Sequence, residues 1–284
     1  MKLLTPRKTL LAAGSITAAA LILSVIPFNM GGCSATNLDV ATLVQGGGKL
    51  VQTASITEKD EPSLGEAVAI QVTNRYPISR DKALTRYVTL VGRTVGAAST
   101  MPNVKYYFAV LDTDQVNAFS GPHGYIMITR GALKMMHNES ELAGVLGHEI
   151  GHVCKHHGLD AVHAAGTAEA FKTMARSEQH AAVFTQGADN LGDIILNTGF
   201  SQPQEEQADE QGVIFMTAAG YNPDGYLQFL QRIQSEQGSS GHPFGTHPGI
   251  KDRVKRVGDQ IARAGTSGKG ATLEDRFKVN VVLR

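Results

Sequence analysis

The sequence predicts a mainly helical α+β domain in which a small β-sheet accompanies many helices. Apolar residues recur at helical spacing over most of residues 61–264. Two short segments, 104–111 and 124–129, are the predicted strands. Because the strands are short and few, we expect helices to supply most of the core. Even without its first 32 residues, the chain of about 250 residues is long enough for one sizeable core.

The expected helices follow one another along the chain. Asn138, with Glu141 three residues later, predicts the start of one helix, and Gly158 predicts its end. Pro203 suits the first turn of a later helix, which Gly220 closes. In order, the expected helices cover residues 62–75, 79–99, 130–137, 139–157, 160–185, 188–199, a segment that carries Glu205 and ends at 219, 223–236 and 248–264.

Residues 148–152 are His148-Glu149-Ile150-Gly151-His152, which is the HExxH pattern of zinc peptidases. Positions i and i+4 of a helix share a face, so His148 and His152 can direct ring nitrogens to one metal ion. Glu149 lies beside the pair and can act as general base toward a water molecule that zinc activates. The alternative is a solvated or core helix with incidental histidines.

A catalytic zinc usually has three protein ligands, so a third is expected outside this motif. Glu205, Asp209 and Gly212 occupy positions i, i+4 and i+7, on one face of a predicted helix. Glu205 can bind the metal, and Asp209 can accept the second N–H of a ligand histidine. Gly212 permits close approach of the HExxH helix. The alternative is that these acidic residues are only solvated near a helix start.

Taken together, these motifs resemble those of the HtpX/BepA/LoiP-like zinc metallopeptidases, relatives of the CAAX prenyl protease. The family pattern combines an HExxH motif with a downstream ExxxD motif, which here are His148-Glu149-xx-His152 and Glu205-xxx-Asp209. The resemblance extends over roughly residues 61–262. It includes the segment Asn117-Ala118-Phe119-Ser120-Gly121-Pro122-His123-Gly124 and the late His247-Pro248 pair. The absence of a second long apolar run makes the chain similar to the soluble or lipid-anchored branch of the family.

The resemblance implies a gluzincin site with one Zn²⁺ per chain, in which the metal ligands are His148, His152 and Glu205, the base is Glu149, and Asp209 holds a ligand histidine. The chain departs from the family at Gln202, where an arginine is usual. An arginine contact is therefore missing or is supplied by another residue.

The resemblance further implies an edge strand that pairs with an extended peptide substrate and includes Asn117, Ala118 and Phe119. Such pairing uses the backbone more than side chains and so gives broad specificity. His247 corresponds to a family histidine near the metal, as a fourth-position or transition-state group with a catalytic role. The alternative is that His247 merely caps the helix that starts at Pro248.

The N-terminus resembles a bacterial lipoprotein signal peptide. Lys2, Arg7 and Lys8 precede an uncharged apolar stretch, and small residues precede Cys33. The resemblance implies a signal peptide over residues 1–32, cleavage before Cys33 and lipidation of its sulfur. One alternative is an uncleaved transmembrane anchor, since the stretch is long enough to span a membrane. A simple secreted protein is another.

Either leading interpretation places the catalytic part in the cell envelope, outside the cytoplasm. Ser34 favours the outer membrane, with the domain facing the periplasm, whereas an uncleaved helix would anchor it in the inner membrane. Residues 33–60 are rich in Gly, Thr and Gln and predict a flexible tether. The metallopeptidase domain is expected over 61–264 and a C-terminal tail over 265–284.

Net charge and cysteine content limit the expected partners and covalent links. Lys+Arg and Asp+Glu each number 26, so the net charge is zero and gives no reason to expect nucleic acid. The two cysteines are Cys33, which lipidation would consume, and Cys154, so no intramolecular disulfide is expected. Cys154 is most simply a small buried apolar residue.

These patterns predict a zinc-dependent endopeptidase that acts on misfolded or misassembled envelope proteins. Its expected partners are extended or unfolded polypeptides, the membrane through a lipid anchor, and the envelope assembly machinery. One alternative is a chaperone-like peptide-binding or assembly factor with little turnover, and another is a zinc hydrolase of non-peptide substrates. The Gly/Ser-rich run 238–245 suggests a loop that brings His247 into the open zinc position as a latency switch. Residues 160–200 could form a lid, a partner-binding surface or a helical hairpin.

Overall fold

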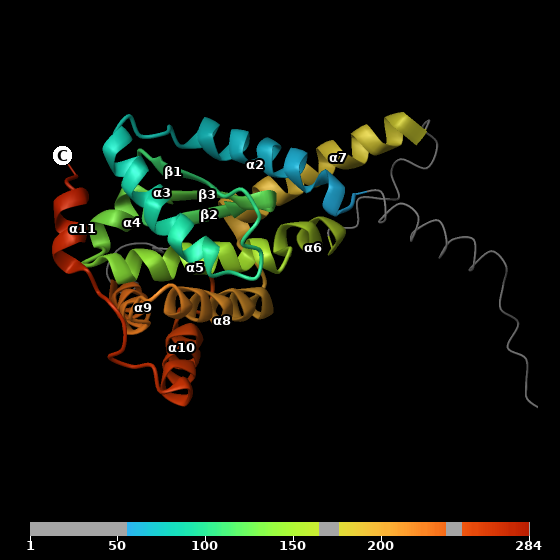
Figure 1. Ribbon diagram of the computed structural model, residues 1–284. Coiled ribbons are helices and arrows are strands. Elements are labelled where there is room, and N and C mark those ends of the chain that lie inside the picture. Colours follow the sequence, from blue (N-terminus) through green and yellow to red (C-terminus); the bar gives the residue numbers. More distant parts are fainter. Residues whose placement is uncertain (1–55, 165–175, 237–245, 284) are drawn as a thin grey trace, which may run out of the picture. The chain divides into compact units, whose positions relative to one another are not determined.

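The computed structural model describes residues 56–164, 176–236 and 246–283, most of which are helical (Figure 1). The α-helices are α2 (Glu61–Arg75), α3 (Lys82–Ala97), α4 (Arg130–Met135), α5 (Glu139–Cys154), α6 (His157–Ala164), α7 (Arg176–Asp193), α8 (Gln202–Ala218), α9 (Asp224–Glu236), α10 (Ile250–Ala264) and α11 (Glu274–Asn280). The short helical turns are η1 (Glu58–Asp60), η2 (Pro122–Gly124) and the π-helical η3 (Ile194–Thr198). The predicted mainly helical α+β class is confirmed.

A small sheet lies among the helices and consists of β1 (Tyr107–Leu111), β2 (Ala118–Gly121) and β3 (Tyr125–Thr129). The strand order is β1-β3-β2, with β3 parallel to β1 and antiparallel to β2. β1 and β3 correspond to the two predicted strands. β2 was expected only as part of the edge-strand segment, because four residues are too few for a periodic pattern. Among the described residues, its place in the strand order leaves one side of β2 without a neighbouring strand.

Both faces of this sheet are buried, and each contributes to a separate hydrophobic cluster. Ile126 and Ile128 pack with apolar residues of α3, α5, α8, α9 and α10. Met127, which lies between them, points to the opposite face and packs with residues of α2, α6 and α7. The alternation of side chains along a strand explains this division. The first cluster lies around α5, the helix that carries the HExxH motif.

Small residues bring α5 and α8 into direct backbone contact. A Cβ added at Gly147 would lie 3.0 Å from the carbonyl oxygen of Gly212, and one at Gly212 would lie 2.9 Å from the backbone nitrogen of His148. A Cβ at Gly151 would lie 2.9 Å from the carbonyl oxygen of Ala208. The glycines therefore set the distance between the HExxH motif and α8, as expected for Gly212.

The HExxH helix is shorter than the sequence predicted. It ends at Cys154 rather than at 157, because His156 has a left-handed φ of 54° through which a helix does not continue. Gly158, the predicted end, instead lies inside α6, where a Cβ would approach the Pro122 side chain to 2.9 Å. Gly158 is therefore a packing residue of the next helix.

Other expected helices also have different bounds, and the segment expected as a helix at 188–199 is the end of α7 followed by η3. α3 begins at Lys82 rather than at 79, because the Asp81 side chain accepts a hydrogen bond from the backbone N–H of Leu84 and caps the helix. The expected helix 160–185 corresponds in part to α6 and α7, with residues 165–175 outside the described part.

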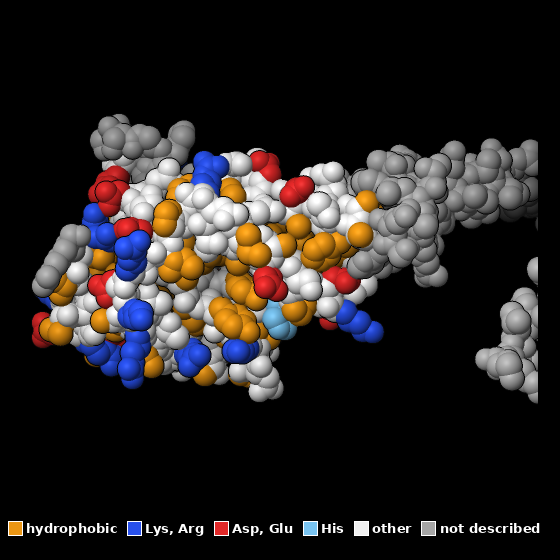
Figure 2. Space-filling view, turned by 90° about the horizontal axis from the view of Figure 1, so that it is seen from above, with side chains coloured by type: hydrophobic (Ala, Val, Ile, Leu, Met, Phe, Trp, Pro, Cys, Tyr) orange, Lys and Arg blue, Asp and Glu red, His pale blue; other side chains and the backbone are white. Residues whose placement is uncertain are grey.

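The tail forms α11, whose Phe277 is buried among residues of the first cluster. On the face that carries α2, apolar side chains are dispersed among polar and charged ones (Figure 2). Within residues 56–164, 176–236 and 246–283, no helix is long and apolar enough to cross a membrane. The predicted signal peptide, Cys33 and the 238–245 loop lie outside the described residues.

Candidate metal centre

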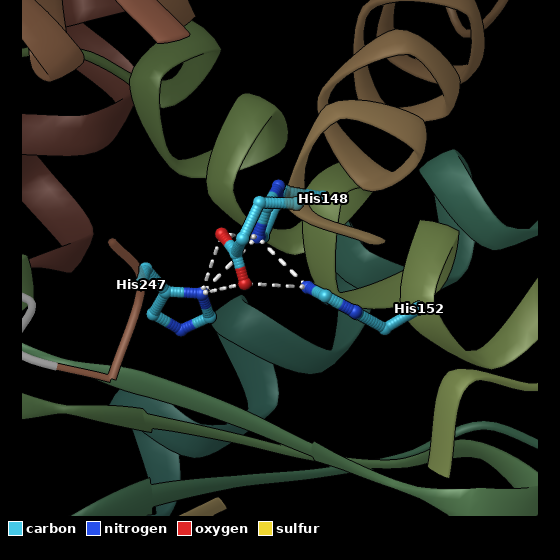
Figure 3. Close-up of side chains that lie close together, drawn as sticks. His148, His152 and His247 are labelled. Atoms are coloured by element: carbon cyan, nitrogen blue, oxygen red, sulfur yellow. Dashed lines mark hydrogen bonds and ion pairs between the residues drawn. The ribbon is translucent and has the colours of Figure 1, made fainter. Parts of the chain in front are cut away.

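His148 and His152 lie one turn apart on α5 and direct ring nitrogens toward the same point (Figure 3). Their Nε2 atoms are 3.1 Å apart. Both residues are buried, each with 2 % of its surface exposed. Asn138 fixes the start of the helix as expected, since its side chain accepts a hydrogen bond from the backbone N–H of Glu141.

Glu205 reaches the same point from the first turn of α8. Its Oε2 lies 3.5 Å from Nε2 of His148, and its Oε1 lies 3.4 Å from Nε2 of His152. Ser201 and Gln204 form a capping box at the start of α8, which fixes this turn. The structure therefore brings together the three residues that the sequence predicted as metal ligands.

His247 is the fourth member of the cluster. Its Nδ1 lies 3.1 Å from both carboxylate oxygens of Glu205 and 3.3 Å from Nε2 of His148. The residue is buried, with 5 % of its surface exposed. It does not cap the following helix, because α10 begins at Ile250 and the residue at its N-cap is Gly249.

The four side chains fit a zinc ion. Four ligand atoms at about 2.0–2.2 Å from a tetrahedral zinc are separated from one another by roughly 3.3–3.6 Å. The separations given above, from 3.1 to 3.5 Å, are close to that spacing, and one ligand atom from each of the four residues lies within 4.8 Å of the other three. Imidazole nitrogens and a carboxylate oxygen are also the ligand types that zinc prefers. His148, His152, Glu205 and His247 thus form a buried cluster compatible with a zinc site.

Glu149 lies beside the cluster in an unusual environment. It is fully buried, yet neither carboxylate oxygen has a hydrogen-bond partner among the described residues. Its Oε1 lies 3.6 Å from Nε2 of His247. A buried carboxylate without hydrogen-bond donors is unfavourable for stability and calls for a functional explanation. Its place next to the four ligand atoms supplies one, since a base for hydrolysis must be able to accept a proton there.

Comparisons with known proteins agree with this geometry. Residues 82–261 match the model of peptidase family M48, which is more than half of the chain. The chain belongs to peptidase family M48. It is a zinc metalloendopeptidase, as the predicted resemblance implied.

Individual relatives of this M48 peptidase are identical to it at about a quarter of the aligned residues. Metalloprotease LoiP of Escherichia coli strain K12 is 26% identical over 242 residues, which cover 82% of this chain and 92% of LoiP. Metalloprotease YcaL of the same strain is 24% identical over 241 residues, with 81% and 92% covered. The beta-barrel assembly-enhancing protease of that strain is 26% identical over 219 residues. That match covers 68% of this chain but only 42% of the relative.

The M48 peptidase holds its candidate ligands through a buried ionic network. Oδ1 of Asp209 lies 2.8 Å from Nδ1 of His148, as the sequence suggested. Arg253 on α10 donates hydrogen bonds to both oxygens of Asp209, at 2.8 and 2.7 Å, and lies 3.0 Å from Oε2 of Glu205. The hydroxyl of Tyr226 donates to Oδ1 of Asp209 at 2.6 Å. These contacts hold the carboxylates of Asp209 and Glu205 in place and favour their ionised forms.

The pKa values in this network follow from burial and from these contacts. Burial alone raises the pKa of Asp209, but Arg253 and the hydrogen bond to His148 outweigh it and lower that pKa well below its usual value. Burial and Arg253 lower the pKa of His148, but hydrogen bonds to Asp209 and Glu205 raise it overall to about 9. Burial lowers the pKa of His152 to about 3, because the charged ring is disfavoured away from water.

Asn117, Ala118 and Phe119 lie where β2 passes the cluster. The backbone C=O of Asn117 accepts a hydrogen bond from the backbone N–H of Thr129, the last residue of β3. Because backbone groups alternate along an antiparallel strand, those of Ala118 face the other way, and its carbonyl oxygen lies 3.3 Å from Nε2 of His247. Phe119 is buried and stacks on Tyr76 at a centroid distance of 5.8 Å.

Sequence reasoning missed Arg253, although the sequence contains a signal for it. Arg253 lies on the buried stripe of α10 with Ile250, Val257 and Ile261, where an arginine is unusual. Its contact with Glu205 provides an arginine near the third ligand, where Gln202 had suggested a missing one.

Proposed function

We propose that this peptidase hydrolyses misfolded or misassembled proteins of the bacterial cell envelope. The observation that carries the proposal is the convergence of three predicted ligands beside the unpartnered carboxylate of Glu149. In this proposal His148, His152 and Glu205 bind zinc, and Asp209 orients His148.

Each residue has a defined part in the reaction. Bound zinc supplies Lewis acidity, which polarises a carbonyl group and makes water more acidic. Glu149 takes a proton from the attacking water and passes it to the leaving amine. Neither oxygen of this carboxylate accepts a hydrogen bond from the described residues, so it gives up no such bond to accept the proton. Nδ1–H of His148 donates to Asp209, and Asp209 is itself held by the Arg253 guanidinium, so the ring keeps its position.

β2 offers a surface for an extended substrate. The backbone groups of Ala118, and by alternation those of Ser120, face away from β3 and toward the edge of the sheet. A substrate strand added there would pass beside Glu149. Asn117 and Phe119 instead face β3, so they hold the edge strand in register rather than contact the substrate backbone.

His247 supports a latent state of the same site. Its Nδ1 lies 3.1 Å from Oε1 of Glu205, where it would take a fourth ligand position, and its Nε2 lies 3.3 Å from the carbonyl oxygen of Ala118 on the proposed substrate edge. One side chain thus covers both the metal and the strand that substrate would use. In the open state His247 would act as a transition-state group, since its Nε2 already lies near Glu149. Higher casein cleavage in His247→Ala would indicate latency, and lower cleavage a transition-state role.

The envelope location rests on two kinds of support. Two of the relatives are metalloproteases that match this chain over nearly their whole length, and another is named for enhancing beta-barrel assembly. The N-terminal sequence supports lipidation of Cys33 and attachment to the outer membrane. The proposed partners are the assembly machinery and unfolded polypeptides. Labelling with a radioactive fatty acid in Cys33→Ala and wild-type cells tests the anchor, because only the wild type should incorporate label.

A chaperone-like assembly factor is the second candidate, and the four-ligand cluster favours it. A site in which four protein side chains surround the metal leaves no position for a substrate carbonyl. The two functions differ in their need for Glu149. Cells that carry Glu149→Gln would keep envelope integrity if binding alone matters, and would lose it if hydrolysis matters.

The test of the peptidase uses the full-length protein purified in detergent. We expect about one zinc per chain and cleavage of casein that a chelator abolishes and added zinc restores. Zinc binding without cleavage in both the wild type and His247→Ala would contradict the proposal and favour the binding role.

A further inference from the structure

His157 is a buried histidine that the site described above does not use. It begins α6, directly after the left-handed turn at His156, and 1 % of its surface is exposed. Its Nδ1 lies 2.8 Å from Nδ1 of His152, the ring nitrogen that faces away from the metal ligands. Its Nε2 lies 3.0 Å from Oε1 of Gln207 on α8.

The donors and acceptors of these three side chains fit together in only one way if His152 is to bind metal through Nε2. The lone pair of Nε2 must then be free, so the proton of the neutral ring lies on Nδ1. Nδ1–H of His152 donates to Nδ1 of His157, which places the His157 proton on Nε2. That N–H donates to the amide oxygen of Gln207, which can only accept.

We propose that His157 is a positioning residue that holds His152 in its metal-binding tautomer and orientation. A hydrogen bond to the second ring nitrogen fixes a ligand histidine in this way, and its loss commonly weakens metal affinity about 10–100-fold. The inference rests on the ligand assignment proposed above. It gives each ligand histidine its own partner, since His148 is held by Asp209 and His152 by His157.

The surrounding fold holds His157 from two sides. The backbone carbonyl of His157 accepts a hydrogen bond from Nε2 of Gln204 at 3.4 Å, so both its backbone and its ring contact α8. Phe200 stacks on His152 at a centroid distance of 4.4 Å and lies 6.0 Å from the ring of His157. α8 therefore supplies the metal ligand Glu205 and also the groups that place His157.

The first test needs no substitution. In zinc-loaded full-length protein with ¹⁵N-labelled histidine, the ring nitrogen shifts report which nitrogen carries each proton. We expect His152 to be protonated at Nδ1, and His157 to be protonated at Nε2 with a bare Nδ1. A proton on Nδ1 of His157 would overturn the inference, because that nitrogen could not then accept from His152.

The second test compares two substitutions by zinc affinity in competition with a chromophoric chelator. His157→Phe keeps the ring volume but removes the acceptor, and we expect zinc affinity to fall about 10–100-fold. His157→Asn returns an acceptor close to the Nδ1 position, and we expect it to restore most of the affinity. The visible spectrum of the cobalt-substituted protein should change in the Phe variant and remain close to that of the wild type in the Asn variant.

His156→Asn is the matched control. It replaces the neighbouring histidine, tolerates the left-handed backbone and leaves the bond between His152 and His157 in place, so zinc affinity should stay within about threefold of the wild type. Equal zinc affinity in wild type and His157→Phe would overturn the role of His157 and leave the peptidase proposal standing. A folded wild type that binds no zinc would overturn the ligand assignment, and this inference with it.

Discussion

Two buried glutamates on α5 have opposite surroundings. Glu139, in the first turn, accepts hydrogen bonds from the hydroxyls of Tyr87 and Tyr221 and from the guanidinium of Arg276. Glu149, near the other end, has no hydrogen-bond partner within the described part of the chain. Both are fully buried. The same residue type on one helix therefore stabilises the fold where its oxygens are satisfied, and it is the proposed base where they are not.

The largest expected stability effect is at Glu139. Replacing Glu139 with Ala leaves two buried tyrosine hydroxyls and one guanidinium without their acceptor. We expect the free energy of unfolding to fall by about 3–5 kcal/mol. Urea denaturation of the zinc-free proteins measures this loss, and a change below about 1 kcal/mol would show that the network is not stabilising.

Packing between α5 and α8 gives the next largest effect. In Gly212→Ala, the new Cβ would approach the backbone nitrogen of His148 to 2.9 Å and force the two helices apart. We expect a loss of about 1–3 kcal/mol in unfolding free energy together with weaker zinc binding.

Gly258→Ala on α10 is the control for this substitution. Its Cβ would meet only the Leu227 side chain, at 3.7–3.9 Å, so we expect no loss and a gain of up to about 1 kcal/mol from helix propensity. Equal destabilisation of both variants would mean that helix contact at Gly212 is not the cause.

The charge of Glu139 also predicts a pH dependence. Burial alone raises the pKa of this carboxyl, but hydrogen bonds from Arg276, Tyr221 and Tyr87 lower it below its usual value of 4.5. A lowered folded-state pKa contributes stability above pH 4.5 that is lost as the pH falls through the folded-state value. We therefore expect unfolding free energy to fall less steeply below pH 4.5 in Glu139→Gln than in the wild type. Parallel curves for the two proteins would contradict this assignment.

The smallest expected stability effect is at Glu149. Glu149→Gln removes a buried charge that has no hydrogen-bond donors, so the unfolding free energy of the zinc-free protein should stay unchanged or rise by about 1 kcal/mol. A loss of unfolding free energy as large as that of the Glu139 variant would show that the two glutamates do not differ in their contribution to stability. Thermal and urea unfolding of the two variants side by side decides the point.

Much of the site could be predicted because its spacing follows helix geometry. His148 and His152 share a helix face through their i, i+4 spacing, and Glu205 and Asp209 do the same on another helix. Long, periodic segments such as α5 and α8 were therefore predicted well. The relation between the two helices came from the resemblance, since spacing within one helix does not say which other helix it meets.

The rest depends on tertiary contacts that leave little trace in local sequence. Arg253 on α10 contacts Glu205 and Asp209, and the sequence around Arg253 does not predict these partners. The sequence placed His157 in the continuation of the HExxH helix. A histidine at 156 does not predict a left-handed turn, whereas a glycine there would. With the turn, His157 meets His152. Without it, the two side chains would point to different faces of one helix.

In the proposed mechanism, Glu149 is the catalytic base of this zinc peptidase. The most direct test is casein hydrolysis by full-length wild type and Glu149→Gln at equal zinc content, each also in the His247→Ala background. We expect the Gln substitution to lower the rate about 10²–10⁴-fold while zinc per chain and stability are kept. Hydrolysis within about threefold of the matching parent, at equal zinc, would contradict it.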